Sequence, residues 1–152
     1  MPKIEHVSFV KAPRSFVFGQ LANSENLPKM VGAYKSVRIV GRERNTEVVE
    51  AEVETFGTKA KGTLRRVYHP DDRIEESLES DLATGTNILT LDDVPEGTRI
   101  RYSADFTLKG ALAWVLGPLV TIGLRNAFAE DSERTKRFIE SRSTGSTRLS
   151  RA

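Results

Sequence analysis

Residues 108–141 read LKGALAWVLGPLVTIGLRNAFAEDSERTKRFIES and join an uncharged half to a highly charged half. The uncharged part, residues 111–124, is apolar nearly all round, so as a helix it must be enclosed. At about 1.5 Å per residue it would span only about 21 Å, less than the ~30 Å hydrocarbon core of a bilayer. We therefore expect no membrane span. We expect a long C-terminal helix whose first half is enclosed by the rest of the chain or by a ligand.

The uncharged half carries two features that bear on access to such an enclosed space. Pro118, after Gly117, removes one backbone hydrogen bond and predicts a kink or a split in the helix. Trp114, the only tryptophan, is expected in the core or in a pocket wall. We expect residues 111–119 to line the mouth of a cavity and to loosen at Gly117-Pro118, so that ligand entry is gated there.

Length and composition are those of one globular domain. The chain has 152 residues, of which 38% are hydrophobic and 29% charged. It contains no cysteine, so disulfides and thiolate chemistry are excluded. No basic N-terminal segment followed by an apolar run is present, and a cytoplasmic location is expected.

The positive charge is concentrated at the C-terminus. Three of the 23 basic residues, Arg142, Arg148 and Arg151, lie in the terminal run RSTGSTRLSRA, and the chain has 21 acidic residues, so residues 1–141 are nearly neutral. Interspersed signs disfavour nucleic-acid binding by the domain. We therefore divide the chain into a domain at 1–141 and a flexible basic tail at 142–152, for which a transient membrane-surface or RNA contact is an alternative.

The chain before residue 108 has a two-residue period in most places. Residues 3–11 alternate as a strand, and Ala12-Pro13 ends it and starts a short helix. A second short helix is expected at residues 25–31. From Tyr34 to Leu108 the pattern predicts six strands joined as hairpins, with turns at 44–46, 57–60, 70–72 and 94–97 among them.

Turn positions and alternation together predict the strand register, because a slip of one residue would turn every apolar side chain outward. The register sets Val37, Ile39 and Gly41 against Val53, Ala51 and Val49; Val53, Ala51 and Val49 against Leu64, Arg66 and Tyr68; Leu64, Arg66 and Tyr68 against Leu78, Glu76 and Ile74; and Asn87, Leu89 and Leu91 against Ala104, Tyr102 and Ile100. Phe106 continues the last inner row.

These elements predict an α+β fold of the helix-grip kind. A curved seven-stranded antiparallel sheet would close around the long C-terminal helix, with the two short helices after the first strand covering one end. The only apolar body left to fill the concave side of the sheet is the long helix.

The element order, the Ala12-Pro13 start of the first helix and two short patterns, YHPDDRI (68–74) and PEGTRIRYSADF (95–106), resemble those of a known group of proteins. Residues 3–141 resemble the START-like, or SRPBCC, superfamily, near its polyketide cyclase/dehydrase-like branch and the branch that resembles the G-subunit of carbon monoxide dehydrogenase. The resemblance implies a deep cavity between sheet and long helix that takes lipids, polyketides, hormones or other apolar molecules. It does not imply one activity.

Motifs of catalytic chemistry are absent from the sequence. There is no HExxH, GxSxG, GxGxxG or phosphate loop, so we predict no metal site, cofactor or catalytic residue. His6, near the end of a strand, and His69, before Pro70 in a turn, are interpreted as structural or surface residues. Asp71-Asp72 and Asp92-Asp93 are interpreted as turn acids.

The inner face of the sheet predicts the binding residues. Arg66 and Glu76 face each other there, and a buried charge is tolerated when it is paired. We predict that they form the polar anchor of an otherwise apolar pocket, in which Arg66 grips a carboxylate, carbonyl or phosphate and Glu76 positions the guanidinium. The full predicted ligand-binding set is Arg66, Glu76, Tyr68, Ala51, Val53, Asn87, Leu89, Tyr102, Phe106, Trp114 and Leu119.

Three classes of function fit this interpretation. The first is binding or transport of an apolar or amphipathic small molecule of lipid, quinone or polyketide type. The second is a polyketide cyclase or dehydratase in which a pocket acid and Tyr68 or Tyr102 supply general acid or base catalysis. The third is a structural partner in enzyme assembly or at the ribosome, with a filled cavity and an exposed apolar patch. The sequence does not set the oligomeric state.

Overall fold

The alternating segment from residue 34 to residue 108 forms six consecutive antiparallel strands, as the two-residue period predicts. The computed structural model describes residues 3–55, 57–110 and 119–151. Its elements are β1 (Lys3–Val10), α1 (Arg14–Ala22), η1 (Ser24–Asn26), α2 (Leu27–Met30), β2 (Tyr34–Glu43), β3 (Thr46–Thr55), β4 (Thr58–His69), β5 (Arg73–Ser80), β6 (Ala83–Val94), β7 (Gly97–Leu108) and α4 (Leu119–Arg151). The predicted element order is confirmed.

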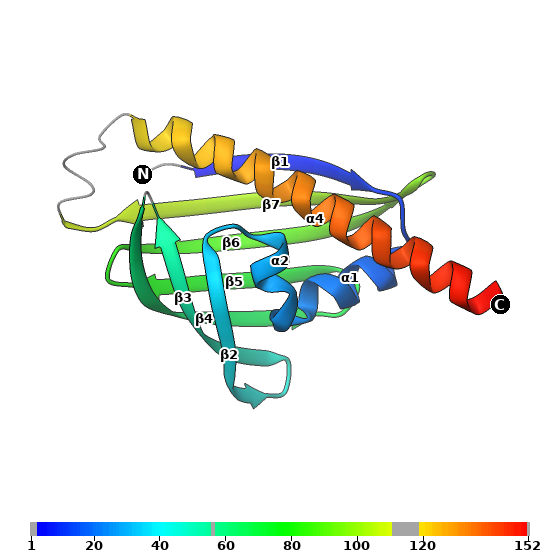
Figure 1. Ribbon diagram of the computed structural model, residues 1–152, viewed down its shortest axis with the longest axis horizontal. Helices are drawn as coiled ribbons and strands as arrows, with labels where there is room; N and C mark the ends of the chain where they lie inside the picture. Colours follow the sequence, from blue (N-terminus) through cyan, green and yellow to red (C-terminus); the bar gives the residue numbers. More distant parts are fainter. Residues whose placement is uncertain (1–2, 56, 111–118, 152) are drawn as a thin grey trace.

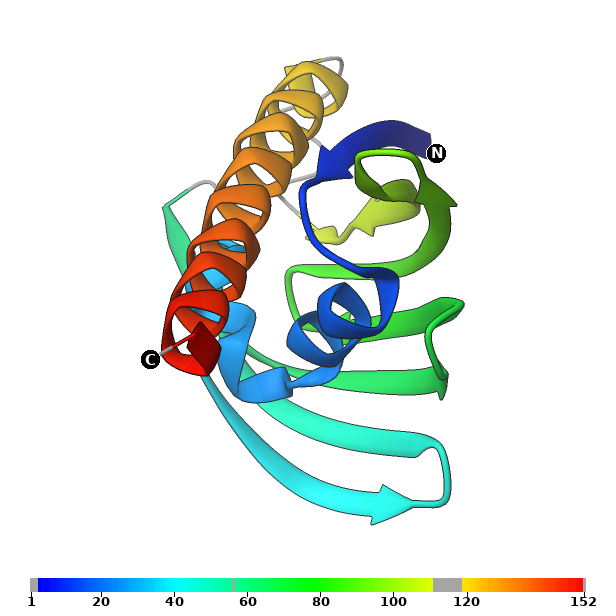
Figure 2. The same ribbon diagram turned by 90° about the vertical axis from the view of Figure 1, so that its right-hand side faces the viewer.

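The seven strands form one sheet in the order β1-β7-β6-β5-β4-β3-β2. Each hairpin lies beside the next, and β1 joins the free edge of β7. The sheet curls, α4 crosses its open side, and α1 and α2 lie on the same side beneath α4 (Figures 1 and 2). α4 contacts both β1 and α2. The α+β helix-grip fold predicted from the sequence is therefore confirmed.

The register of two hairpins matches the prediction. β5 follows β4 with Arg66 opposite Glu76, and β7 follows β6 with Leu89 opposite Tyr102. The turn at residues 70–72 supports the first of these, since Asp71 takes the positive φ of 62° that this turn needs. The rows that hold the predicted polar anchor, Arg66 and Glu76, and the predicted binding residues Leu89 and Tyr102 therefore lie as expected.

The predicted register of β3 against β4 is wrong. Ala51 lies opposite Gly62 instead of Arg66, and Arg66 lies opposite Glu47. Thr55 pairs with Thr58, so the chain reverses more tightly and earlier than the predicted turn at residues 57–60. The shift is four residues, an even number, so the apolar side chains keep their face.

The predicted register of β2 against β3 is wrong by two residues. Val37 lies opposite Ala51, and Ile39 lies opposite Val49. Irregular pairing between Tyr34 and Ser36, and again between Ile39 and Gly41, changes the register along β2. Alternation alone does not show where such irregularities occur.

The core lies between the sheet, the short helices and the charged half of α4. Its fully buried side chains are Val10, Val17, Met30, Val49, Leu64, Ile74, Leu91, Ile100 and Ile139. In β1 the side chains that face this core are Ile4, Ser8 and Val10, while Val7 and Phe9 are exposed on the outer face. Ile139 is the apolar residue that anchors the second half of α4.

The expectation that the whole apolar half of the helix is enclosed is wrong for its described part. Leu119 is 67% exposed and Ile122 is 59% exposed. Ile122 shares a helix face with Asn126 and Ala129, which are also exposed, because residues three and four apart lie on one face. Trp114 and the expected break at Gly117-Pro118 lie outside the described residues.

α4 continues to Arg151, beyond the helix end expected near Ser141 (Figure 1). Residues 142–151 contain no proline, so nothing in this segment prevents the helix from continuing. The flexible tail at 142–152 stays a prediction. No helix in the described part of the chain has the length and apolarity needed to cross a membrane.

Candidate functional site

A cavity of about 470 Å³ lies between the concave face of the sheet and the helices α2 and α4. This volume is within the range of about 300–1,000 Å³ that is usual for small-molecule sites. Most of its lining is apolar: Leu21, Leu27, Met30, Val31, Val53, Leu64, Leu78, Leu89, Phe106, Leu108, Leu124 and Phe128. Exposed lining residues, among them Lys35, Gly57 and Glu130, mark its opening to solvent.

Seven of the eleven predicted site residues line this cavity. They are Arg66, Glu76, Val53, Asn87, Leu89, Tyr102 and Phe106. Tyr68, Ala51 and Leu119 do not belong to the lining, and Trp114 lies outside the described residues. The prediction of Ala51 rests on the incorrect β3–β4 register. The prediction of Leu119 rests on the expectation of an enclosed helix face, whereas this residue is exposed. Tyr68 instead takes part in a polar network beside the cavity.

The sequence predicts that the long helix borders the cavity, but the residues of α4 that line it are not the predicted Leu119. Leu124, Phe128, Asp131 and Thr135 line the cavity at intervals of three and four residues, and they therefore form one stripe along the helix. The charged pairs Glu130 with Arg134 and Glu133 with Arg137, each four residues apart, predict a solvated face for that part of the helix. The spacing of Leu124 and Phe128 ahead of Asp131 and Thr135 is the signal that predicts the stripe.

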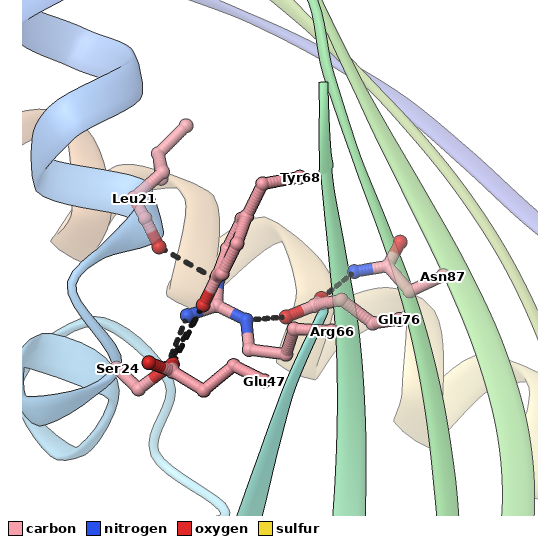
Figure 3. A network of polar contacts seen from close by, with 7 residues as sticks. All are labelled: Leu21, Ser24, Glu47, Arg66, Tyr68, Glu76 and Asn87. Atoms are coloured by element: carbon pink, nitrogen blue, oxygen red, sulfur yellow. Dashed lines mark hydrogen bonds and ion pairs between the residues drawn. The ribbon is translucent and has the colours of Figure 1, made fainter. Parts of the chain in front are cut away.

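Arg66 is 1% exposed, and it is held on every side by protein groups. Its Nε donates to Glu76 Oε2 at 2.9 Å, Nη1 donates to Ser24 Oγ at 2.9 Å, and Nη2 donates to the Leu21 carbonyl at 2.6 Å. The guanidinium also lies 5.4 Å from the centre of the Tyr68 ring. Figure 3 shows it pointing toward the end of α1 and toward Ser24.

Glu47 is the second acid of this network and is buried opposite Arg66 on β3. It accepts hydrogen bonds from Ser24 Oγ, from the Tyr68 hydroxyl at 2.7 Å and from Arg42 Nε at 2.7 Å. Burial alone would raise the pKa of Glu47, but these three donors more than offset that effect and lower it. The carboxylate is thus stabilised in its ionised form.

The predicted side-by-side placement of Arg66 and Glu76 on the inner face is confirmed. All three nitrogens of Arg66 have protein acceptors, and Glu76 compensates its charge. An ion pair that is buried and hydrogen-bonded in this way is costly to break from one side. The gripping of a ligand by Arg66 stays a prediction.

The cavity floor beyond Glu76 has different polar chemistry. Within the described residues, the buried side-chain atoms without a hydrogen-bond partner include Asn87 Oδ1 and the Tyr102 hydroxyl, and both residues line the cavity. Burial raises the pKa of Tyr102, and the negative charges of Glu76 and Asp131 raise it further. Tyr102 is therefore a neutral phenol at physiological pH.

Asp131 brings a carboxyl group to the cavity from α4. Burial raises its pKa against the opposing effects of a 3.0 Å hydrogen bond from the Gly32 amide and the nearby Arg134 guanidinium. Thr135 donates to the Met30 carbonyl at 3.3 Å, one turn further along the helix. These bonds fasten α4 to the segment around α2 that forms one wall of the cavity.

Each of the two histidines contacts one polar side chain. A ring nitrogen of His6 lies 2.8 Å from Ser132 Oγ and joins β1 to α4. His69 Nε2 lies 2.9 Å from Glu75 Oε2 at the start of the β4–β5 turn. Neither histidine lines the cavity.

Solved structures with this fold are numerous and distant in sequence. A START superfamily protein from Mycobacterium smegmatis matches with a TM-score of 0.68 at 18% identity, over 94% of this chain and 97% of that one. TTHA0849 from Thermus thermophilus matches with a TM-score of 0.73 at 18% identity, over 88% and 97% of the two chains. The di-domain ARO/CYC StfQ from the steffimycin biosynthetic pathway matches with a TM-score of 0.75 at 17% identity, over 95% of this chain and 51% of that one. At such identities the similarity is one of fold.

The sequence itself matches one family over most of its length. Comparison with curated proteins gave no match. Residues 10–129 match the family described as polyketide cyclase / dehydrase and lipid transport, which covers the chain from the end of β1 into the first half of α4. The chain therefore belongs to the polyketide cyclase / dehydrase and lipid transport family, within the START-like, or SRPBCC, superfamily.

Proposed function

We propose that this protein binds an apolar or amphipathic small molecule, of lipid, quinone or polyketide type, in the cavity between the sheet and α4. The observation that carries the proposal is the cavity itself, about 470 Å³ in volume and lined mostly by aliphatic and aromatic side chains. Such a space is large enough to enclose a ligand of several rings or a long chain, and burial of its apolar surface provides the driving force. Membership of the family described above supports the same class of ligand.

A titration with the neutral fluorescent probe N-phenyl-1-naphthylamine tests the proposal. Its fluorescence is expected to rise and saturate at one probe per chain. Ala127 is exposed and lines the cavity on α4, so Ala127→Trp is expected to fill the opening and weaken probe binding. Ala129 is exposed on the same helix without lining the cavity, and Ala129→Trp is the matched control. Equal binding by both variants, or no saturable binding at all, would contradict the proposal.

A cyclase or dehydratase activity is the second candidate, and two groups in the cavity favour it. The Tyr102 hydroxyl is unpartnered among the described residues, and Asp131 has a carboxyl group whose pKa is raised by burial. A neutral phenol and an acid with a raised pKa are the groups that general acid catalysis uses. Incubation with a β-hydroxy ketone should then release water, as followed by mass spectrometry, and Asp131→Asn should stop the release. Equal rates in buffer and in both proteins would exclude this activity for that substrate class.

The remaining expectations about partners rest on composition. The nearly neutral domain disfavours nucleic acid, and a transient membrane-surface contact by the basic end of the chain is an alternative role for residues 142–152. The cytoplasmic location also stays a prediction, which the absence of cysteine supports because it fits a reducing compartment.

A further inference from the structure

We infer that the cavity selects a neutral ligand with a hydroxyl-type group, which binds between Asn87 and Tyr102, and that it discriminates against carboxylates. The inference rests on the proposed function, because it names the ligand chemistry of the same cavity. It reverses the expectation that Arg66 recognises an acidic ligand.

The orientation of the Asn87 amide is set by its neighbour. Asn87 Nδ2 lies 3.0 Å from Glu76 Oε1. An ionised carboxylate only accepts hydrogen bonds, so the NH₂ group must face Glu76 and the amide oxygen must face away from it. Figure 3 shows the oxygen on the side away from Glu76. This oxygen is buried and has no partner among the described residues, and Asn87 lines the cavity, so the oxygen is an unused acceptor in the cavity wall.

Tyr102 offers the second unused group. Its hydroxyl is buried without a partner in the described part of the chain, and its ring packs edge-to-face against Phe128 of α4 with centroids 6.3 Å apart. Asn87 pairs with Ala104, two residues from Tyr102 on the same face of β7. Diagonal neighbours of this kind are about 7–8 Å apart at Cα, so the two side chains lie next to each other on the inner face of the sheet. The two side chains do not bond to each other, since neither atom has a partner within the described ranges.

Together, the two groups match the hydrogen-bonding pattern of a hydroxyl. A ligand hydroxyl can donate to Asn87 Oδ1 and accept from the Tyr102 phenol, so both buried atoms gain a partner. A carboxylate only accepts, so it would face Asn87 Oδ1 without a proton to share. It would also lose its hydration in a mostly apolar cavity whose lining already contains two carboxyl groups, Glu76 and Asp131.

The cations of the lining do not offset this cost, because each of them is already paired or exposed to solvent. Arg66 already compensates Glu76 and points away from Asn87 toward Ser24 and Leu21. The Arg134 side chain is 44% exposed and pairs with Asp131 at 2.9 Å. Lys35 is exposed. Solvated cations of this kind contribute little to the binding of a buried anion.

Three ligands with one ring system test the inference. 2-Naphthol, 2-naphthoate and naphthalene are compared at neutral pH by their displacement of N-phenyl-1-naphthylamine from the wild-type chain. We expect 2-naphthol to bind about three- to tenfold more tightly than naphthalene, the ratio that one or two net hydrogen bonds give. We expect 2-naphthoate to bind at least about tenfold more weakly than 2-naphthol.

Two variants assign the effect to the site. Tyr102→Phe removes one of the two hydrogen bonds and should reduce the advantage of 2-naphthol over naphthalene by at least about twofold. Tyr68→Phe removes the same atom from a tyrosine outside the cavity, and it should leave that advantage unchanged. Binding of 2-naphthoate as tight as that of 2-naphthol, or an advantage of 2-naphthol that is unchanged by Tyr102→Phe, would overturn the inference. If the neutral probe and all three ligands fail to bind, the proposed function itself is wrong, so the two failures are distinguishable.

Discussion

Tyr68 and Tyr102 both carry their hydroxyl groups into the interior of this sheet, yet their surroundings differ. The Tyr68 hydroxyl donates to Glu47 and lies 3.2 Å from Ser24 Oγ, and the Arg66 guanidinium lies 5.4 Å from the centre of the Tyr68 ring. The Tyr102 hydroxyl is buried and has no partner in the part of the chain that the structure describes. One end of the concave face is therefore a closed polar network, and the other is a hollow with unused polar atoms.

This difference separates structural polar groups from those available to a ligand. A buried polar group without a hydrogen bond costs folding free energy, and proteins keep few of them. The nitrogens of Arg66 already donate hydrogen bonds to protein groups, so they have little capacity left to bind a ligand. The unpaired groups of Asn87 and Tyr102 cost folding free energy, and a bound molecule that forms hydrogen bonds with them would remove this cost. They are therefore better markers of the binding site than the groups around Arg66.

The largest expected effect is on stability, in Arg66→Met. The change leaves Glu76, Ser24 and the Leu21 carbonyl without a cationic donor inside the protein. Breaking a buried pair from one side costs about 3–5 kcal/mol in the free energy of unfolding, as urea denaturation would measure. Arg38→Met removes a pair with Glu50 in which the Arg38 side chain is 74% exposed, and it should cost less than about 1 kcal/mol. A small loss in Arg66→Met, together with weaker binding of acids alone, would restore Arg66 as the ligand anchor.

A smaller effect distinguishes the two tyrosines. Tyr68→Phe removes a hydroxyl that donates to a buried carboxylate, and it should lower the free energy of unfolding by about 1.5–3 kcal/mol. Tyr102→Phe removes a buried hydroxyl that has no partner among the described residues, so the unliganded protein should be unchanged or more stable. Denaturation of both variants in one buffer measures the contrast. Equal destabilisation would mean that the Tyr102 hydroxyl has a partner after all.

The pH dependence of the free energy of unfolding should reveal how much the ionised Glu47 carboxylate stabilises the polar network around Arg66. Its pKa is lower in the folded chain than the usual value near 4.3–4.5, so ionised Glu47 stabilises the fold above that unfolded pKa. This contribution is lost as the pH falls through the folded pKa. Glu47→Gln should therefore be less stable than the wild type at neutral pH and should lose less on acidification. Denaturation midpoints measured from neutral pH down to acid would reveal it, and parallel curves would contradict the assignment.

The smallest effect is expected at the C-terminus. Arg142 lies 5.1 Å from the centre of the Phe138 ring, an exposed cation–π contact of about 0.5–1 kcal/mol. Deletion of residues 142–152 should therefore shift the melting temperature by only a few degrees. A much larger fall would mean that this end of α4 packs on the domain or on another copy of the chain.

Much of this architecture could be predicted because alternation and turn chemistry are local. The rows through Arg66 and Glu76 and through Leu89 and Tyr102 follow from turns with clear sequence signals. The β2–β3 and β3–β4 registers failed because irregular pairing along β2 and the tight reversal at Thr55–Thr58 have no such signal. An error of an even number of residues keeps every face correct, so the fold was predicted even where the pairing was not.

The binding site was harder to predict because it depends on which partners each polar atom finds. The sequence places Arg66 and Glu76 together, but it does not show that Ser24 and Leu21, far away in the chain, occupy the other nitrogens of Arg66. The role of Asp131 is not predicted either, because its contact with Gly32 depends on how α4 packs. Long-range contacts of this kind are decided by tertiary packing.

The most direct test of a ligand site at the hollow end is an NMR titration of the wild-type chain with 2-naphthol. Backbone amide shifts should change most at Asn87, Leu89 and Tyr102 and at Phe128 of α4, all of which line the cavity. Shifts around Ser24 and Glu47 should change little. The largest changes at Ser24 and Glu47, or changes confined to the outer face of the sheet, would contradict the assignment of the ligand to the hollow end.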